Sequence, residues 1–190
     1  MSNLREYLLQ KKGAVTSWRN KIRDDGSQPA QLSARVTAEG RTGVRRIRVR
    51  DFQIIFDSGP ELAGHSLGPG SQEMQLGVLG TCLTHIFLTQ AALQDVPLDT
   101  INVEVTANID HRGGQPGFED VPVYPVNVRY TAHIESPASR EQIAALHEAV
   151  ERTCPIYNFL INPWVAASYA DSKLSFSSLL KFNGADISQR

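Results

Sequence analysis

The sequence has little of what marks secreted, membrane-spanning and nucleic-acid-binding proteins. Its 190 residues include only two cysteines, too few for the disulfide framework of a small secreted domain. The N-terminal segment has no apolar core of signal-peptide length, and no uncharged apolar run approaches the ~20 residues that span a bilayer. Nineteen basic and twenty acidic side chains leave a formal charge of -1, so no overall charge attracts nucleic acid or an anionic membrane. These absences predict a cytoplasmic protein with neither a membrane nor a nucleic-acid partner.

The composition is that of a folded domain with an N-terminal extension. Apolar residues make up 41% and charged residues 21% of the chain, close to the averages for globular proteins. Residues 1–31 are expected to form a helical appendage and a linker. Leu4 and Leu8 lie on one side of a short helix, Gly13 is expected to end it, and one or two further turns follow before the polar linker. Residues 32–190 are expected to form the main domain.

Within the main domain, the hydrophobic pattern alternates between periods of two and of about 3.6 residues. It predicts three strands between 32 and 56, a loop over 57–71, a helix over 72–93, strands over 101–109 and 124–134, a helix from Ser139, and a last strand near 174–182. Ser139 and Gln142 form a capping box at the start of the second helix. This order predicts an α+β fold, with antiparallel sheets around a long central helix.

The helix predicted over 72–93 is apolar on nearly all its sides. A helix of this kind belongs in the middle of a core or in an oligomer interface. Gly77 and Gly80 each destabilise a helix by roughly 1 kcal/mol relative to alanine. We therefore expect another backbone to pack closely against these two glycines.

The two cysteines allow two interpretations: a working redox pair or two inert buried thiols. Cys82 lies inside the apolar helix, and Cys154 ends the second helix on its apolar side, just before Pro155. A peroxide-reducing cysteine attacks as the thiolate, which a nearby cation favours, and its sulfenic acid then condenses with a second thiol. Cys154 is the only candidate for that thiol. His85, one turn beyond Cys82, is interpreted either as a base or, preferably, as the donor of a structural hydrogen bond.

Three other patterns have more ordinary explanations. The arginines at 46, 48 and 50 are expected to occupy the solvated face of a hairpin, because no aromatic residues alternate with them as in a nucleic-acid site. The Gly-Pro-Gly at 68–70 is interpreted as a turn into the helix; a phosphate cradle is the alternative. The five histidines show no metal-ligand spacing, so no metal is expected.

The cysteine segments resemble those of a known family. The run from Gly68 to His85, GPGSQEMQLGVLGTCLTH, is similar to the central-helix signature of the OsmC/Ohr proteins (osmotically inducible protein C and organic hydroperoxide resistance protein). The segment from Cys154 to Ile156 resembles their second cysteine segment. The resemblance implies an OsmC-like fold that forms an intertwined homodimer, with two active sites at the subunit interface.

The resemblance also implies the roles of individual residues. Cys82 is then the peroxidatic cysteine and Cys154 the resolving one. Arg41, in a Gly-Arg-x-Gly turn, inherits the arginine that lowers the thiolate pKa and stabilises the departing oxygen. The family has a glutamate at the start of the central helix to orient that arginine. Here Gln72 holds that position, so either Glu73 takes the role through a small shift or the arginine–carboxylate pair is altered.

These expectations combine into one hypothesis and two rivals. The first is a thiol peroxidase of oxidative-stress defence that reduces organic hydroperoxides, is regenerated by a lipoyl-type or other dithiol, and holds no bound cofactor. The second is a peroxide- or thiol-sensing protein with little turnover, which Gln72 favours. The third is a structural dimer with vestigial thiols.

Overall fold

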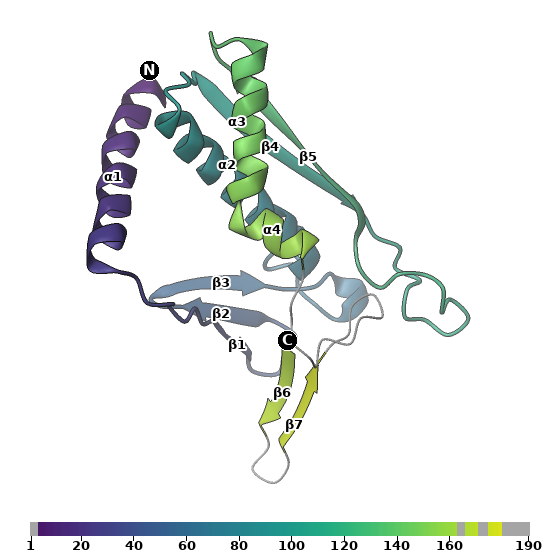
Figure 1. The fold of residues 1–190 in the computed structure, drawn as a ribbon. Coiled ribbons are helices and arrows are strands. Elements are labelled where there is room, and N and C mark those ends of the chain that lie inside the picture. The colour runs from purple at the N-terminus through teal and green to yellow at the C-terminus, as the bar shows by residue number, and fades with distance from the viewer. Residues whose placement is uncertain (1–3, 163–165, 171–174, 180–190) are drawn as a thin grey trace.

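The long helix α2 (Ser71–Leu93) forms the centre of the chain, with the other elements arranged around it (Figure 1). The structure, a computed structural model, describes residues 4–162 and the backbone of residues 166–170 and 175–179. Besides α2, its elements are the helices α1 (Leu4–Asp25), α3 (Arg140–Thr153) and α4 (Pro155–Ile161), a short 3-10 helix at Pro60–Leu62, and the strands β1 (Arg35–Ala38), β2 (Arg45–Val49), β3 (Phe52–Phe56), β4 (Thr100–Asn108), β5 (Val126–Glu135), β6 (Ala166–Ala170) and β7 (Ser175–Leu179).

The strands form three antiparallel sheets: β1-β2-β3, β4-β5 and β6-β7. The residues of β4 alternate between exposed and half-buried along the whole strand, because successive side chains of a strand point to opposite faces. The inner face of the β4-β5 sheet packs against α2. The predicted α+β class, with antiparallel sheets around a central helix, is confirmed.

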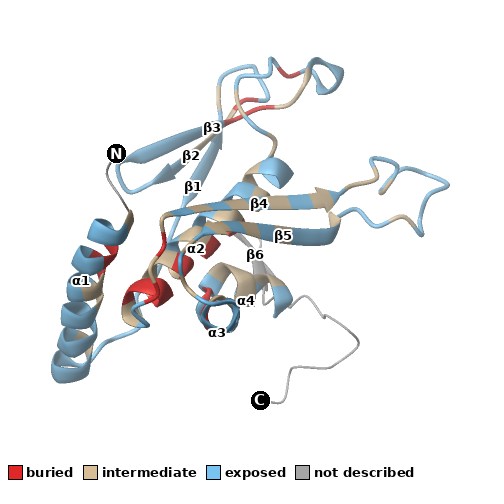
Figure 2. Ribbon diagram, turned by 90° about the horizontal axis from the view of Figure 1, so that it is seen from above, coloured by how far each residue is buried: buried red, intermediate tan, exposed pale blue. Residues whose placement is uncertain are grey.

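The core is formed where α2, α3 and the β4-β5 sheet meet (Figure 2). Leu83 and Phe87 of α2 and Leu146 and Val150 of α3 are fully buried there. The predicted capping box starts α3: the Ser139 hydroxyl accepts the N–H of Gln142, whose side-chain oxygen accepts the N–H of Ser139.

Of the two glycines in α2, one has the expected close packing. A Cβ at Gly80 would lie 3.2 Å from Cγ2 of Val105 and 3.7 Å from the carbonyl oxygen of Val103, both on β4. A Cβ at Gly77 would meet nothing within 4 Å. Gly80 therefore lets α2 lie close on β4, whereas the prediction for Gly77 is wrong within a single chain.

A single chain covers α2 only in part. By length and composition α2 is apolar enough to span a membrane, a test that the core helix of a soluble protein also passes. Only 33% of the most apolar 18-residue stretch of α2 is buried within the chain. Val78 of α2 is 45% exposed, and Phe52 of β3 is 64% exposed. The expected intertwined homodimer would cover such apolar surfaces, and it stays a prediction.

The N-terminal segment is one continuous helix, so the prediction that Gly13 ends it is wrong. Contacts with the rest of the chain hold the first half of α1 in place. Leu8 is buried in the core, Arg5 forms a bidentate ion pair with Asp99 at 2.6 and 3.0 Å, and Lys12 pairs with Asp95 at 2.6 Å. These contacts offset the roughly 1 kcal/mol that a glycine costs a helix. The expected domain boundary at residue 31 stays a prediction.

The C-terminal part contains the strand predicted near 174–182 and two further elements. The strand β7 confirms that prediction, whereas the helix α4, which follows α3 immediately, and the strand β6, which pairs with β7, were not predicted. The predicted strand positions Leu174, Leu180 and Phe182 lie outside the described residues.

Candidate active site

The two cysteines lie in contact although 72 positions separate them in the sequence. The sulfur of Cys154 lies 3.4 Å from the sulfur of Cys82. Cys82 is half-buried in the middle of α2, and Cys154 is fully buried. One thiol is thus open to a small solute, while its neighbour is shielded from bulk solvent. The structure brings together the two residues expected to form a redox pair.

The backbone at the α3-α4 junction holds Cys154 in this position. Cys154 ends α3, donating its N–H to the carbonyl of Val150 at 2.8 Å, and Pro155 begins α4. Proline disfavours helical geometry in the preceding residue, and Cys154 accordingly has an extended ψ of 113°. The Asn158 side chain donates to the carbonyl oxygens of Cys154 and Glu151 at 2.9 and 2.8 Å. This junction turns the chain so that the sulfur of Cys154 faces α2.

The surroundings of Cys154 favour the protonated thiol. Burial raises its pKa, and the adjacent Cys82 raises it further, while backbone N–H groups of Tyr157 and Ile156 act in the opposite direction. A buried thiol that keeps its proton is a weak nucleophile toward peroxide. Cys154 is therefore the shielded thiol of the pair, and Cys82 is the more accessible one.

A hydrogen-bonded group that the sequence analysis missed lies beside the pair. The Tyr130 hydroxyl, from β5, lies 2.5 Å from Nε2 of His147 and donates to Glu151 at 2.9 Å. Burial raises the pKa of Tyr130, as do Glu151 and the charge that Cys154 can carry. The Tyr130 ring also meets the Tyr157 ring edge-on, with centroids 6.3 Å apart. The group links β5, α3 and α4 around the buried thiol. Its one sequence signal is that His147 and Glu151 are four residues apart on a helix.

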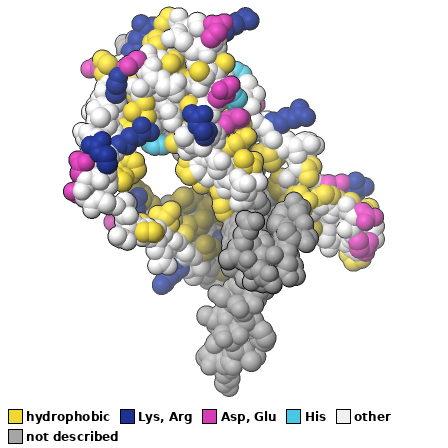
Figure 3. Space-filling view, viewed as in Figure 1, with side chains coloured by type: hydrophobic (Ala, Val, Ile, Leu, Met, Phe, Trp, Pro, Cys, Tyr) yellow, Lys and Arg dark blue, Asp and Glu magenta, His cyan; other side chains and the backbone are white. Residues whose placement is uncertain are grey.

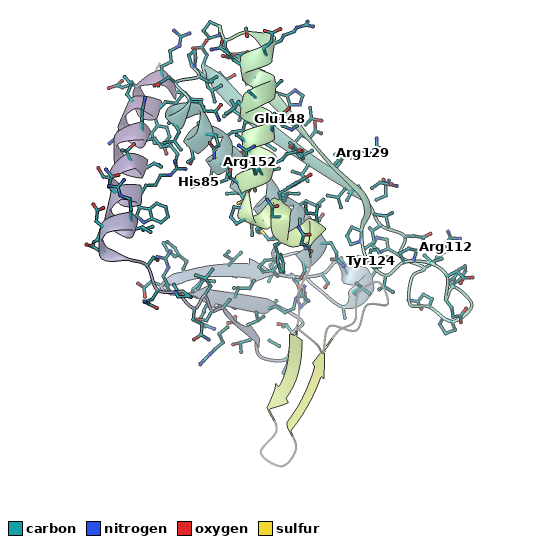
Figure 4. The ribbon with its side chains drawn as sticks, viewed as in Figure 1. His85, Arg112, Tyr124, Arg129, Glu148 and Arg152 are labelled. Carbon is teal, nitrogen blue, oxygen red and sulfur yellow. The ribbon has the colours of Figure 1, made fainter. Side chains whose placement is uncertain are left out.

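An apolar cavity of about 490 Å³ opens next to this group. Leu79, one turn before Cys82, forms one wall, and Tyr130 and Tyr157 form another, while neither cysteine lines the cavity. Tyr124 and Arg129 line it from the β5 side (Figure 4). Its size is within the ~300–1,000 Å³ typical of small-molecule sites. A hydrophobic substrate of moderate size would fit there.

The structure does not bring the other expected site residues to the thiols. Arg41 is exposed in the turn between β1 and β2. Glu73 caps α2, where its carboxylate accepts the Gly70 N–H at 2.7 Å. At 100° per residue, the nine positions between Glu73 and Cys82 place them on opposite sides of α2. Gln72, by contrast, lines the apolar cavity. Within one chain, Gln72 rather than Glu73 is the polar residue on the site's side of the helix start.

The remaining motifs have structural explanations or none. Arg48 and Arg50 are exposed on the hairpin, as expected, whereas Arg46 is half-buried, forms an ion pair with Glu39 and donates to Gln53 at 2.9 Å. Gly70 is the N-cap of α2, as expected of a turn into the helix. The His85 ring makes no hydrogen bond with any residue that the structure describes. The expectation that His85 donates a structural hydrogen bond is therefore wrong for that part of the chain. Within the same residues, no three His, Cys, Asp or Glu side chains form a metal site.

Fold and site together define an α+β protein with a dithiol between its central helix and the end of the next helix. The family model of OsmC-like proteins matches residues 64–167, more than half of the chain. The chain belongs to the OsmC family, and the predicted resemblance is confirmed.

Two solved structures show the same fold. An OsmC-like protein from Mycoplasma pneumoniae superposes with a TM-score of 0.61 at 18% identity, covering 72% of this chain and 91% of that one. An OsmC-like protein of unknown function from Vibrio cholerae gives a TM-score of 0.53 at 14% identity, covering 68% and 93%. By sequence, the chain matches no curated protein.

Proposed function

We propose that the chain is a cytoplasmic thiol peroxidase that reduces organic hydroperoxides. The observation that carries the proposal is the 3.4 Å contact between a half-buried and a fully buried thiol. Such a pair can pass from sulfenic acid to disulfide without a large movement. Membership of the OsmC family supports hydroperoxide-related redox chemistry in this chain.

The reaction follows from the two environments. The Cys82 thiolate attacks the terminal oxygen of ROOH, the O–O bond breaks, and the departing alkoxide takes a proton from water to give ROH. The Cys154 thiol then condenses with the sulfenic acid on Cys82, which forms the S–S bond and releases water. A dithiol, lipoyl-type or other, reduces the bridge by exchange and becomes a disulfide itself. No bound cofactor or metal enters these steps.

The apolar cavity suits the organic part of the substrate. Its walls include Leu79, one turn before Cys82, and Tyr157, three residues after Cys154, although neither cysteine lines the cavity itself. Burial of an alkyl or aryl group there contributes roughly 25 cal/mol per Å² of apolar surface. Hydrogen peroxide lacks such a group, so the cavity favours organic hydroperoxides over it.

The expected role of Arg41 depends on the homodimer. Arg41 is exposed at the tip of the β1-β2 hairpin and has no described contact with Cys82 within one chain. A second chain that covers the apolar surfaces of α2 and β3 would have to bring the arginine to the thiol. We include this intertwined dimer in the proposal, with Arg41 as the cation that favours the Cys82 thiolate.

One experiment separates this proposal from its rivals. The reduced protein is treated with one equivalent of cumene hydroperoxide and its free thiols are counted, and dihydrolipoamide is then added with excess peroxide. A peroxidase loses two thiols per chain and then turns over many times. Cys154→Ser should trap sulfenic acid at Cys82, and Cys82→Ser should leave Cys154 unreacted. An unreacted Cys82 thiol in the first variant would refute the assignment of the attacking cysteine.

Gln72 favours a second candidate, a sensor with little turnover. It stands at the helix position where the family has a glutamate, and it lines the apolar cavity. Without that carboxylate, the arginine has no partner to hold it there. A sensor would form the disulfide stoichiometrically but turn over slowly with dihydrolipoamide. A gain of turnover in Gln72→Glu would favour this second candidate.

A further inference from the structure

A cleft of about 740 Å³ separates α1 from the elements that carry the thiols. The contacts that anchor α1 lie between Arg5 and Lys12, and beyond them α1 and α2 diverge (Figure 1). Basic, histidine and hydrophobic side chains gather beside the resulting hollow (Figure 3). The side chains that the argument uses are Tyr7, Lys11, Trp18 and Arg19 of α1 and His85 and Ile86 of α2.

The cleft carries positive charge that no carboxylate offsets. Lys11 and Arg19 supply this charge, His85 adds a basic side chain, and none of the lining residues is acidic. Lys11 is only 9% exposed, yet neither it nor Arg19 forms an ion pair with any described residue. Its neighbour Lys12, in contrast, pairs with Asp95 at 2.6 Å. The Lys11 stem is buried, while its nitrogen stays accessible from the cleft and can pair with an anion there.

The described contacts of Lys11 agree with an open anion site. Its nitrogen lies 5.7 Å from the centroid of the Tyr7 ring, which also lines the cleft. On the opposite wall, burial lowers the pKa of His85, and the positive charge of Lys11 lowers it further. His85 lies between α2 and α1 (Figure 4). Two basic groups therefore face each other across the cleft with no negative group between them.

The rest of the lining is suited to an apolar body. Tyr7 and Trp18 present aromatic rings from α1, 44% and 62% exposed, and Ile86 presents an aliphatic side chain from α2. The volume is within the ~300–1,000 Å³ of small-molecule sites. A ligand that satisfies both parts of the lining is a flat or branched apolar molecule with one anionic group.

We propose that this cleft binds an organic carboxylate with an aromatic or apolar body, whose charge pairs with Lys11. The apolar body lies against Tyr7 and Trp18. The site is distinct from the apolar cavity beside the thiols, because the two share no lining residue. The proposal gives the N-terminal helix a function as one wall of a ligand site, and it does not depend on the peroxidase reaction.

The test is a calorimetric titration of the full-length, fully reduced protein without peroxide. The probe is 2-naphthoate, and its control is 2-naphthamide, which has the same body without the charge. We expect one naphthoate per chain and an affinity at least about tenfold weaker for the amide. Equal affinity for both would overturn the proposal. Absence of binding by both would overturn it as well.

Matched variants assign the charge to its residue. Lys11→Met keeps the apolar stem that packs in the cleft and should weaken naphthoate binding at least about tenfold, leaving the amide unchanged. Lys21→Met removes the same charge from an exposed position of α1 outside the cleft and should bind as the wild type does. Arg19→Gln should weaken naphthoate binding less, because Arg19 is exposed. Unchanged binding in Lys11→Met, or an equal loss in Lys21→Met, would refute the role of Lys11.

Discussion

Oxidation of Cys82 and Cys154 to a disulfide should raise the thermal stability of the chain. The perturbation is best made with diamide, which couples neighbouring thiols without peroxide. The measurement then tests the geometry of the pair and not its reactivity. The two sulfurs need to approach by only about 1.4 Å, from 3.4 Å to a bond length of about 2.05 Å.

The magnitude follows from the chain that the bridge would enclose. The two cysteines are 72 positions apart, and closing a loop of that length in the unfolded state stabilises the folded state by about 4 kcal/mol. For a protein of this size, 1 kcal/mol corresponds to about 2–4 °C in Tm, so the full effect would be about 8–16 °C. Strain in the bridge or residual structure in the unfolded chain would lower it toward about half that value.

The assay is differential scanning calorimetry of reduced and oxidised protein at one protein concentration. The concentration is fixed because the expected homodimer would make Tm depend on it. Mass spectrometry of unreduced peptides confirms the bridge before each scan. Cys154→Ser treated with diamide in the same way is the control, and its Tm should not change.

Two outcomes would contradict this prediction. A bridge between Cys82 and Cys154 that leaves Tm unchanged or lowers it would mean that the folded chain does not hold the sulfurs in bonding reach. A bridge that forms between chains would mean that the pair within one chain is not the working pair.

Three further predictions concern the core, the loop before α2 and the hairpin arginine. Leu83→Ala removes a fully buried side chain of α2 and should destabilise the chain by about 2–5 kcal/mol in urea unfolding, whereas Leu9→Ala, at an exposed position of α1, should cost far less. Asp57 has a pKa below the usual range because of a hydrogen bond with the backbone of Ser58 and of those that it accepts from the N–H groups of His65 and Leu67 at 2.8 and 3.2 Å. The contribution of Asp57 to stability is therefore present above the unfolded pKa of about 3.9 and is lost as pH falls through the folded pKa. The difference in Tm between the wild type and Asp57→Asn should accordingly shrink below about pH 4. A difference in Tm that does not change with pH would contradict this prediction. Arg41→Ala should slow the attack of Cys82 on cumene hydroperoxide by about tenfold or more, measured as stopped-flow thiol loss at pH 7. The control Arg48→Ala, in the same hairpin, should retain the wild-type rate. Equal rates in the wild type and both variants would show that Arg41 is not the active-site cation.

Local signals in the sequence were enough to predict most elements. Alternation with a period of two identified β4 and β5, the Ser139 capping box fixed the start of α3, and Pro155 placed Cys154 at a helix end. Each of these features depends on residues within one turn or one strand of one another. The same is true of the long central helix.

What the sequence did not predict depends on contacts between distant segments. The continuity of α1 through Gly13 depends on ion pairs with Asp95 and Asp99, more than eighty positions away. The hydrogen bonds of Tyr130 with His147 and Glu151 arise where β5 crosses α3, and no local pattern indicates that crossing. Which of Gln72 and Glu73 lies on the side of α2 that lines the apolar cavity depends on the packing of the helix, and within one chain it is Gln72. Which of the two supports the arginine stays a prediction.

The one-sided attachment of α1 has a mechanical consequence. At 1.5 Å per residue, the segment from Lys12 to Asp25 is an arm about 20 Å long that extends from a fixed end. A rotation of about 10° around that end would displace the far tip by about 3 Å, while the ion pairs near Arg5 and Lys12 would move much less. A small tilt of α1 thus changes the width of the cleft beside Trp18. The cleft can therefore accept ligands of different thickness without a change in the internal structure of α1 or of the elements that it faces.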